Sequence, residues 1–174
     1  GSLVFCIRKC QKMEFDVDVR LLSQQFVDDY PSSLYPEFMH KHARPYACLL
    51  IDTHEDYIIS IPFRSSIHHN HAFLFSGTQR SKSTRSGLDY TKLVLIQKLE
   101  YIDNSAALVD NDEYKETRTN IVKIVNQMSK YIDDYVNHMK GTQLLHPREF
   151  SRRYRYSTLK YFHDILGIES SAEP

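Results

Sequence analysis

The chain of 174 residues lacks any hydrophobic run that approaches the roughly 20 residues of a membrane-spanning helix. Its opening residues also lack the basic region and small-residue cleavage site of a signal peptide. Three cysteines, Cys6, Cys10 and Cys48, form an odd set without the paired spacing of a zinc site. These absences predict a protein of the reducing cytoplasm, with buried thiols in place of disulfides and with no membrane partner.

The sequence has no net charge either, because 22 Lys and Arg balance 22 Asp and Glu. A zero sum argues against an anionic partner, but the charges are unevenly distributed. Six bases face one acid in each of the segments 63–98 and 140–160, and six acids face one base in each of 14–37 and 100–116. If the two basic segments share a face, the protein has a strong local positive field. The alternative is that acids and bases pair across the surface.

Length and 41% hydrophobic content suit one α+β domain over residues 1–174, with a β-rich core over about 40–102 and a helical part over about 110–167. Apolar and β-branched runs predict strands; these cover residues 3–10, 46–52, 57–62, 71–76 and 92–102. The polar tetrapeptide 53–56 has the length of a hairpin loop, so we expect a compact antiparallel sheet or small barrel. The basic stretch 77–90 is expected to be a mobile loop.

Three segments have helical patterns. Asp18 is expected to cap a short helix that continues to Val27. A stripe at steps of three and four residues predicts one long amphipathic helix from Asp110 to Gly141, packed on the sheet; it consists of Ile121, Val125, Met128, Ile132, Tyr135 and Met139. Ser157 is expected to cap a last helix that ends at Gly167.

Residues 61–75, IPFRSSIHHNHAFLF, place many titratable and anion-binding side chains in one short connection. His68, His69 and His71 are candidates for proton transfer, since histidine titrates closest to neutral pH. Arg64, followed by Ser65 and Ser66, offers donors to a phosphate. The histidines could instead be structural or solvent-facing rings.

The same histidines raise the possibility of a zinc site, with His69 and His71 on one face of a strand. No cysteine or carboxylate lies near them in sequence to complete a tetrahedral ligand set. We therefore expect chemistry without a metal or other cofactor, and a metal-dependent phosphohydrolase is the weaker alternative.

A second polar group precedes the first central strand and comprises His40, Lys41, His42 and Arg44. Pairing of the two central strands would bring Arg44 close to Arg64, which requires an anion between them. That anion could be a phosphate, or simply Glu37 or Asp89. RNA carries its own nucleophile, the 2′-hydroxyl, so a base, an acid and cationic groups suffice to cleave it.

Near the C-terminus, arginines alternate with tyrosines in the sequence SRRYRYSTLKY. Cations suit the RNA backbone and aromatic faces suit stacked bases, although the tyrosines could equally belong to the core. The residues expected to contact RNA are Lys41, Ser66, His69, Arg80, Lys82, Arg85, Arg152, Arg153, Arg155 and Tyr154.

Arg-Pro-Tyr at 44–46, an apolar strand, a short polar hairpin and YIISIPFRSS at 57–66 together resemble the core of the ToxN/AbiQ family. These proteins are endoribonuclease toxins of bacterial type III toxin–antitoxin systems. GLDYTKLVLI at 87–96 resembles the family's Leu-x-x-x-Lys strand. STLKYFHDILGI at 157–168 is similar to the C-terminal helix of the CptN- and TenpN-like branches.

The resemblance implies a highly curved antiparallel sheet wrapped by helices, related to the MazF-like toxin fold. It implies sequence-specific, metal-independent cleavage of single-stranded cellular or phage RNA, leaving a 2′,3′-cyclic phosphate. It further implies an inhibitor, a small repeat RNA pseudoknot that the toxin processes and with which it assembles into closed protein–RNA complexes. The rival class is a non-catalytic RNA-binding module, which would bind RNA in a salt-sensitive manner without forming that product.

By this resemblance, Arg44 occupies the basic position before the first strand and Ser65 the serine that ends the second. Arg64 stands where the family commonly has Ser or Thr, and His68 stands near a position where it usually has lysine. The general acid and the general base therefore stay unassigned, with one of them expected among residues 68–71. The full set of expected catalytic residues is Arg44, Arg64, Ser65, His68, His71 and His40.

Overall fold

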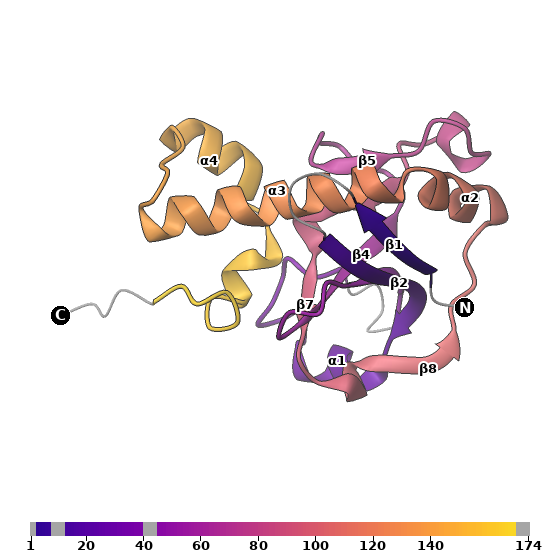
Figure 1. The fold of residues 1–174 in the computed structure, drawn as a ribbon, viewed down its shortest axis with the longest axis horizontal. Helices are drawn as coiled ribbons and strands as arrows, with labels where there is room; N and C mark the ends of the chain where they lie inside the picture. Colours follow the sequence, from indigo (N-terminus) through magenta and orange to yellow (C-terminus); the bar gives the residue numbers. More distant parts are fainter. Residues whose placement is uncertain (1–2, 8–12, 40–44, 170–174) are drawn as a thin grey trace.

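The computed structural model describes residues 3–7, 13–39 and 45–169 (Figure 1). In this part of the chain eight strands form one antiparallel sheet: β1 (Leu3–Ile7), β2 (Met13–Leu22), β3 (Ala47–Asp52), β4 (Ile58–Arg64), β5 (Ala72–Leu74), β6 (Gly87–Asp89), β7 (Val94–Ile96) and β8 (Ile102–Ala106). The α-helices are α1 (Gln24–Asp29), α2 (Asn111–Thr119), α3 (Ile121–Lys140) and α4 (Pro147–Tyr154). Short 3₁₀ turns complete the described fold: η2 (Arg80–Lys82), η3 (Tyr90–Lys92), η4 (Leu99–Tyr101) and η5 (Thr158–Tyr161).

The sheet has the order β1-β2-β3-β4-β6-β5, with β7 paired to β4 and β8 paired to β2. The predicted hairpin between the two central strands is confirmed, because Asp52 of β3 pairs with Ile58 of β4. The start of β4 pairs with β7, whereas its end at Arg64 pairs with Gly87 of β6. Among the described residues no pairing closes the sheet. The α+β class and the antiparallel sheet are thus confirmed, and the barrel is not.

The prediction of a helix beginning at Asp18 was wrong. β2 continues to Leu22, and α1 begins after Ser23, whose hydroxyl accepts a hydrogen bond from the Phe26 amide. The burial pattern of β2 shows why this segment is a strand. Phe15 and Val17 are buried at a period of two, which is the pattern of a strand with one face on the core. Spacing within 18–27 fits both patterns, and pairing with β3 and β8 decides between them.

Two other boundaries differ from expectation. The single strand predicted over 92–102 is divided into β7, η4 and the start of β8, and the loop predicted over 77–90 contains η2 and β6. Both β6 and β7 are three-residue strands that depend on pairing with β4, a contact that local sequence does not reveal.

Figure 1 shows α2 and α3 running end to end along one side of the sheet, with α4 against the C-terminal half of α3, whereas α1 lies apart from them beside β8. The predicted long helix is interrupted at Asn120, and its stripe is buried from Ile121 to Tyr135, while Met139 is exposed. Burial of each apolar side chain of this size contributes roughly 1.5–3 kcal/mol to the free energy of unfolding. Over the described residues, no helix has the length and apolar character needed to cross a membrane.

The C-terminal region contains a helix that the sequence reading missed. α4 begins at Pro147, a favoured first residue of a helix, and His146 caps it by accepting from the Arg148 amide. Ser157 caps the next turn as predicted, but only the 3₁₀ turn η5 follows it. Gly167 ends this region with a positive φ of 68°.

Gly87 is required where β6 enters the sheet, since a Cβ added there would lie 2.1 Å from the carbonyl oxygen of Phe73. Gly87→Ala is therefore expected to force β6 away from β5 and to lower the free energy of unfolding by about 1–3 kcal/mol or more. Urea unfolding measures this loss. The control is Gly77→Ala, where the nearest atom is a side-chain oxygen of Glu116 at 3.2 Å and no backbone atom beyond the adjacent residues lies within 4 Å. Equal midpoints for Gly87→Ala and wild type would contradict the prediction.

Candidate active site

The end of β4, the loop after it, η3 and the end of α4 meet around a pocket of about 240 Å³. This pocket is lined by Arg64, His68, His69, His71, Thr91, Lys92, Arg152, Arg153 and Tyr156. Its cations come from both of the basic segments, 63–98 and 140–160. The charge pattern left open whether these segments share a face, and at this pocket they do.

Asp89, at the end of β6, is the buried centre of the site. Its carboxylate accepts hydrogen bonds from the Arg64 guanidinium at 2.7 Å and from the Thr91 amide and hydroxyl at 2.9 and 2.7 Å. The His69 Nε2 atom lies 3.2 Å from its Oδ1. Burial works to raise the pKa of Asp89, but the hydrogen bonds from His69, Thr91 and Arg64 outweigh it and lower the pKa to about 2. Asp89 is thus a fixed negative charge at neutral pH.

His69 has both ring nitrogens engaged. Its Nε2 faces Asp89, and its Nδ1 accepts a hydrogen bond from the His71 backbone amide at 3.0 Å. This pattern assigns the proton to Nε2 and leaves neither nitrogen available to a substrate. The sequence reading placed His69 in contact with RNA. The geometry instead gives it a positioning role, in which it fixes the backbone that carries His71.

The His71 ring lies against that of His69, with ring centroids 5.8 Å apart and an interplanar angle of 18°. Burial, together with the neighbouring His69 and Arg153, lowers its pKa. The ring is therefore neutral at neutral pH, and its nitrogens make no hydrogen bond to another described residue. His68 is exposed at the edge of the same pocket. Two imidazoles thus remain for proton transfer.

Arg64 and Lys92 supply positive charge beside these rings. Arg64 uses one guanidinium nitrogen on Asp89, and its other donors make no hydrogen bond within the described part of the chain. Lys92 donates from Nζ to the carbonyl oxygen of Tyr156 at 2.9 Å. Burial and the nearby Arg64 lower the pKa of Lys92. The two cations form a positively charged wall of the pocket that the protein only partly neutralises.

Arginines of α4 close the other side of the pocket and are themselves paired. Arg153 donates to Glu149 at 2.7 Å and to Asp134 at 3.0 Å, and Arg152 donates to Glu149 at 3.0 Å. Pairing of acids with bases, the alternative raised by the charge pattern, therefore also occurs.

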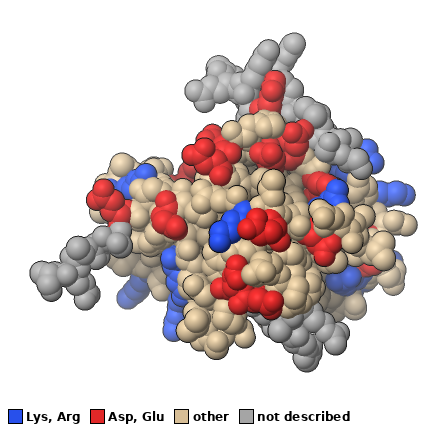
Figure 2. All heavy atoms as spheres, turned by 90° about the horizontal axis from the view of Figure 1, so that it is seen from below, with Lys and Arg blue, Asp and Glu red and all other residues tan. Residues whose placement is uncertain are grey.

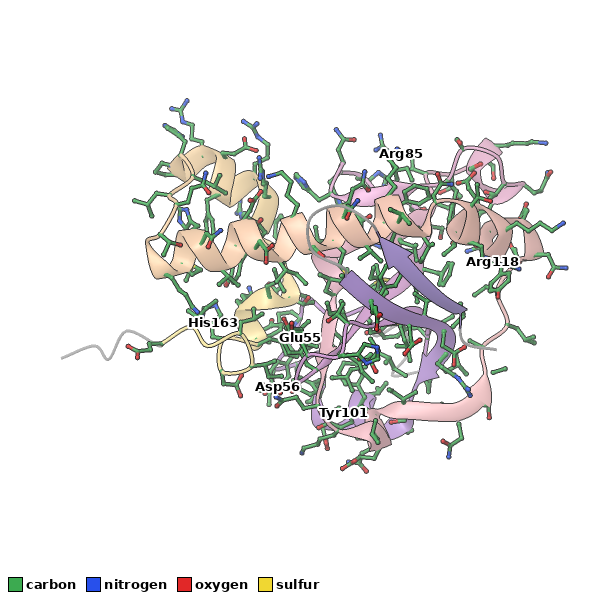
Figure 3. All side chains as sticks on the ribbon, viewed as in Figure 1. Glu55, Asp56, Arg85, Tyr101, Arg118 and His163 are labelled. Atoms are coloured by element: carbon green, nitrogen blue, oxygen red, sulfur yellow. The ribbon has the colours of Figure 1, made fainter. Side chains whose placement is uncertain are left out.

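The loop between β5 and β6 carries three residues that were expected to contact RNA. Arg80 pairs with Asp110, directly before α2, and with Glu113 of α2, and Lys82 is exposed near Gln79. Arg85, which Figure 3 shows beside β5, donates to the His69 carbonyl oxygen at 3.1 Å and to Asn70 at 2.9 Å. Through these two hydrogen bonds Arg85 stabilises the loop that carries His69 and Asn70.

Several expected site residues lie elsewhere. Ser65 is half-buried next to Arg64 and is not among the pocket-lining residues, and the Ser66 amide donates to Thr84 at 2.9 Å, towards the β5–β6 loop. Tyr154 is 4% exposed and donates its hydroxyl hydrogen to the Tyr131 carbonyl oxygen, so its ring belongs to the core and does not fit the predicted base contact. The predicted residues His40, Lys41, His42 and Arg44 fall outside the described residues.

Sequence reasoning missed Thr91 and Lys92, chose Tyr154 over Tyr156 among the tyrosines that alternate with the arginines, and raised Asp89 only as a possible partner of Arg64. One feature of the sequence does point to Asp89. Asp89 is the single acid among the six bases of residues 63–98, which is unusual enough to suggest a buried partner for those charges. The contribution of Lys92 and Tyr156 depends on the packing of η5 against η3, which no local pattern indicates.

The acidic segments meet at a separate groove. Asp16, Asp18, Asp52 and Asp103 line it around Arg20. Figure 2, which views the molecule from the end where α1 and β8 lie, shows more acidic than basic side chains on that face. The charges are therefore sorted in space even though they sum to zero, and the positive pocket is the part suited to an anion.

Across residues 3–7, 13–39 and 45–169, no group of three His, Cys, Asp or Glu side chains is arranged to hold a metal ion.

Comparison with known proteins gave no family model, no curated protein and no solved structure that matches the chain. Its function is therefore inferred from the chemistry of the pocket and from the sequence motifs.

Proposed function

We propose that this protein is a metal-independent endoribonuclease that cleaves single-stranded RNA through attack of the 2′-hydroxyl on the adjacent phosphate. The observation that carries the proposal is a neutral His71 that shares one pocket with a second imidazole, His68, and with the cations Arg64 and Lys92. A base, an acid and cationic stabilisation are what this reaction requires.

In the proposed mechanism, a ring nitrogen of His71 removes the proton of the 2′-hydroxyl, and the oxygen attacks phosphorus. The bond from phosphorus to the 5′-oxygen breaks, and that oxygen takes a proton from His68, leaving a 2′,3′-cyclic phosphate. Arg64 and Lys92 bind the non-bridging oxygens, where negative charge accumulates in the transition state. His69 and Asp89 hold His71 and Arg64 in place and transfer no proton.

The resemblance to ToxN/AbiQ proteins supports a more specific proposal. The chain would be the toxin of a bacterial type III system, acting in the cytoplasm and held silent by a repeat RNA pseudoknot within a closed protein–RNA complex. The antiparallel sheet with helices along one side is compatible with the curved, MazF-like sheet of that family. The family's serine position is Ser65, directly after β4, and because Ser65 does not line the pocket the phosphate contacts are assigned to Arg64 and Lys92.

Arg64→Ala tests the phosphate site. We expect RNA cleavage in excess chelator by the wild-type protein, and a loss of about 10²–10³-fold in kcat for the variant, because a preorganised donor to the phosphate is removed. Cleavage is followed by the appearance of 2′,3′-cyclic phosphate ends. Expression of the wild-type protein should arrest bacterial growth, and expression of Arg64→Ala should not.

Arg118→Ala is the matched control. Arg118 is an exposed arginine on α2, at the opposite end of the helical layer from α4 (Figure 3). The Arg118→Ala variant should cleave RNA and arrest growth as the wild type does. RNA binding without the cyclic product in the wild-type protein would instead favour the non-catalytic binding module, and undiminished cleavage by Arg64→Ala would remove the proposed phosphate site.

A further inference from the structure

Tyr156 lies at the edge of the pocket and is one of the few large rings exposed to solvent in the described part of the chain. Its side chain is 63% exposed, whereas the neighbouring Tyr154 is 4% exposed. Exposed apolar surface of this kind contributes little to folding, because the ring gains no burial. Its place on the rim of a cationic pocket therefore calls for another explanation.

The backbone around Tyr156 is held on three sides. On one side, Tyr154 is anchored in the core through its hydroxyl group at 2.7 Å from the Tyr131 carbonyl oxygen. On the other, Ser157 caps η5 by accepting from the Leu159 amide at 3.2 Å. The carbonyl oxygen of Tyr156 itself accepts from Lys92 at 2.9 Å. The exposed ring thus projects from a fixed point whose position is coupled to a cation of the pocket.

Arg155 places a positive charge over the Tyr156 ring. Its guanidinium carbon lies 5.2 Å from the centroid of the Tyr156 ring, and its side chain is exposed. An aromatic face beside a cation is the combination that binds a single-stranded nucleotide, because the base stacks on the ring while the cation meets a backbone phosphate. Lys92 extends the same positive surface towards Arg64, where the scissile phosphate is proposed to bind.

We infer that Tyr156 and Arg155 form a nucleotide subsite in which the Tyr156 ring stacks on an unpaired RNA base next to the scissile phosphate. This inference rests on the proposed function, since it places the base relative to the bond that is cut. The subsite accepts any base, because every base has a stacking face, and it favours purines, which offer the larger surface. Tyr156, in place of the predicted Tyr154, is then the aromatic contact of this region.

The test separates binding from cleavage by using short single-stranded RNA whose sugars all carry 2′-O-methyl groups, so that no nucleophile is present. Fluorescence anisotropy at a fixed salt concentration measures Kd. Tyr156→Ala is expected to raise Kd about 10- to 100-fold, since stacking on one base is worth roughly 1–3 kcal/mol. Tyr156→Phe keeps the ring and should bind as the wild type does.

Tyr114→Ala is the matched control, because Tyr114 also has an arginine 5.8 Å from its ring but lies on α2, away from the pocket. It should leave Kd unchanged. An abasic nucleotide moved along the probe should weaken wild-type binding most at one position and have no effect there on Tyr156→Ala. With cleavable RNA, the loss in Tyr156→Ala should fall on KM more than on kcat.

The outcomes are distinguishable. If wild-type protein cleaves RNA but Tyr156→Ala binds the methylated probe equally well, the subsite is wrong and the nuclease proposal stands. Binding that depends on Tyr156, without any cleavage of unmodified RNA, would support the subsite and overturn the nuclease. A protein that neither binds nor cleaves RNA overturns both, and would point to a protein partner for the exposed ring.

Discussion

His71→Ala is expected to lower kcat for RNA cleavage by about 10²–10⁴-fold, the usual contribution of a positioned general base. The variant should fold, because the contacts that hold residue 71 belong to its backbone. Its amide donates to His69, and its carbonyl oxygen accepts from the Tyr90 amide at 3.1 Å. Binding of methylated RNA should therefore persist while cleavage is lost, and parallel measurement of both would show it.

The pH dependence of cleavage gives an independent check. A base works in its deprotonated form, and the pKa of His71 is lowered by burial and by the neighbouring His69 and Arg153. The acidic limb of the kcat/KM profile should therefore lie below the ordinary histidine value of about 6.5. An acidic limb above that value would contradict the assignment of His71 as the base.

His54→Asn provides the control for a surface histidine. His54 lies in the β3–β4 hairpin loop, is 55% exposed, and has a φ of 62° that asparagine tolerates well. Its imidazole faces Asp16 and not the pocket. The variant should keep wild-type cleavage, so a comparable loss in both histidine variants would mean that His71 has no specific role.

The parts of the fold that the sequence predicts well are those with local signals. The β3–β4 hairpin follows from two apolar runs around four polar residues, and α3 follows from a stripe repeated over five turns. The helical reading of residues 18–22 failed because the spacing of three between Val19 and Leu22 is typical of a helix. Pairing with β3 and β8, with a register shift between Arg20 and Leu22, makes this segment a strand. α4 carried a usable signal in Pro147 that was overlooked.

The residues of the candidate site also fall into those that local sequence reveals and those that only tertiary packing brings together. Arg64 and the histidines are visible because unlike chemistry is crowded into one short connection. Lys92 and Tyr156 reach the pocket only through the docking of η3 and η5, where the Thr158 hydroxyl donates to the Leu93 carbonyl oxygen. Likewise the different roles of His68, His69 and His71, three imidazoles within four residues, depend on where Asp89 is buried, and no spacing in the sequence distinguishes them.

Asp89→Asn is expected to cost roughly 3 kcal/mol of the free energy of unfolding near neutral pH. Removing one partner of a buried charge pair leaves the other uncompensated, at about 3–5 kcal/mol, and the value here should be low in that range because Arg64 is partly exposed. Chemical denaturation measures it. Asp110→Asn is the matched control, since Asp110 also pairs with an arginine, Arg80 at 3.2 Å, but is 56% exposed; it should change stability by less than about 1 kcal/mol.

The acid dependence of this difference identifies its cause. The pKa of Asp89 falls from about 3.9 in the unfolded chain to about 2 in the folded protein, so its ionised form stabilises the fold above about pH 4. That stabilisation, on the order of 2 kcal/mol, is lost as the pH falls through the folded value of about 2. The wild type should therefore lose more stability than Asp89→Asn over this window.

Other carboxylates with lowered pKa values, among them Asp29, Glu37 and Glu149, also stabilise the fold less in acid, but they are present in both proteins. The difference between wild type and variant therefore isolates Asp89. If the two proteins lose stability in parallel as the pH falls, the Asp89 carboxylate is not the charge that holds Arg64 and His69. The pocket would then lack the buried anion on which the separation of His69 from the proton-transferring His71 depends.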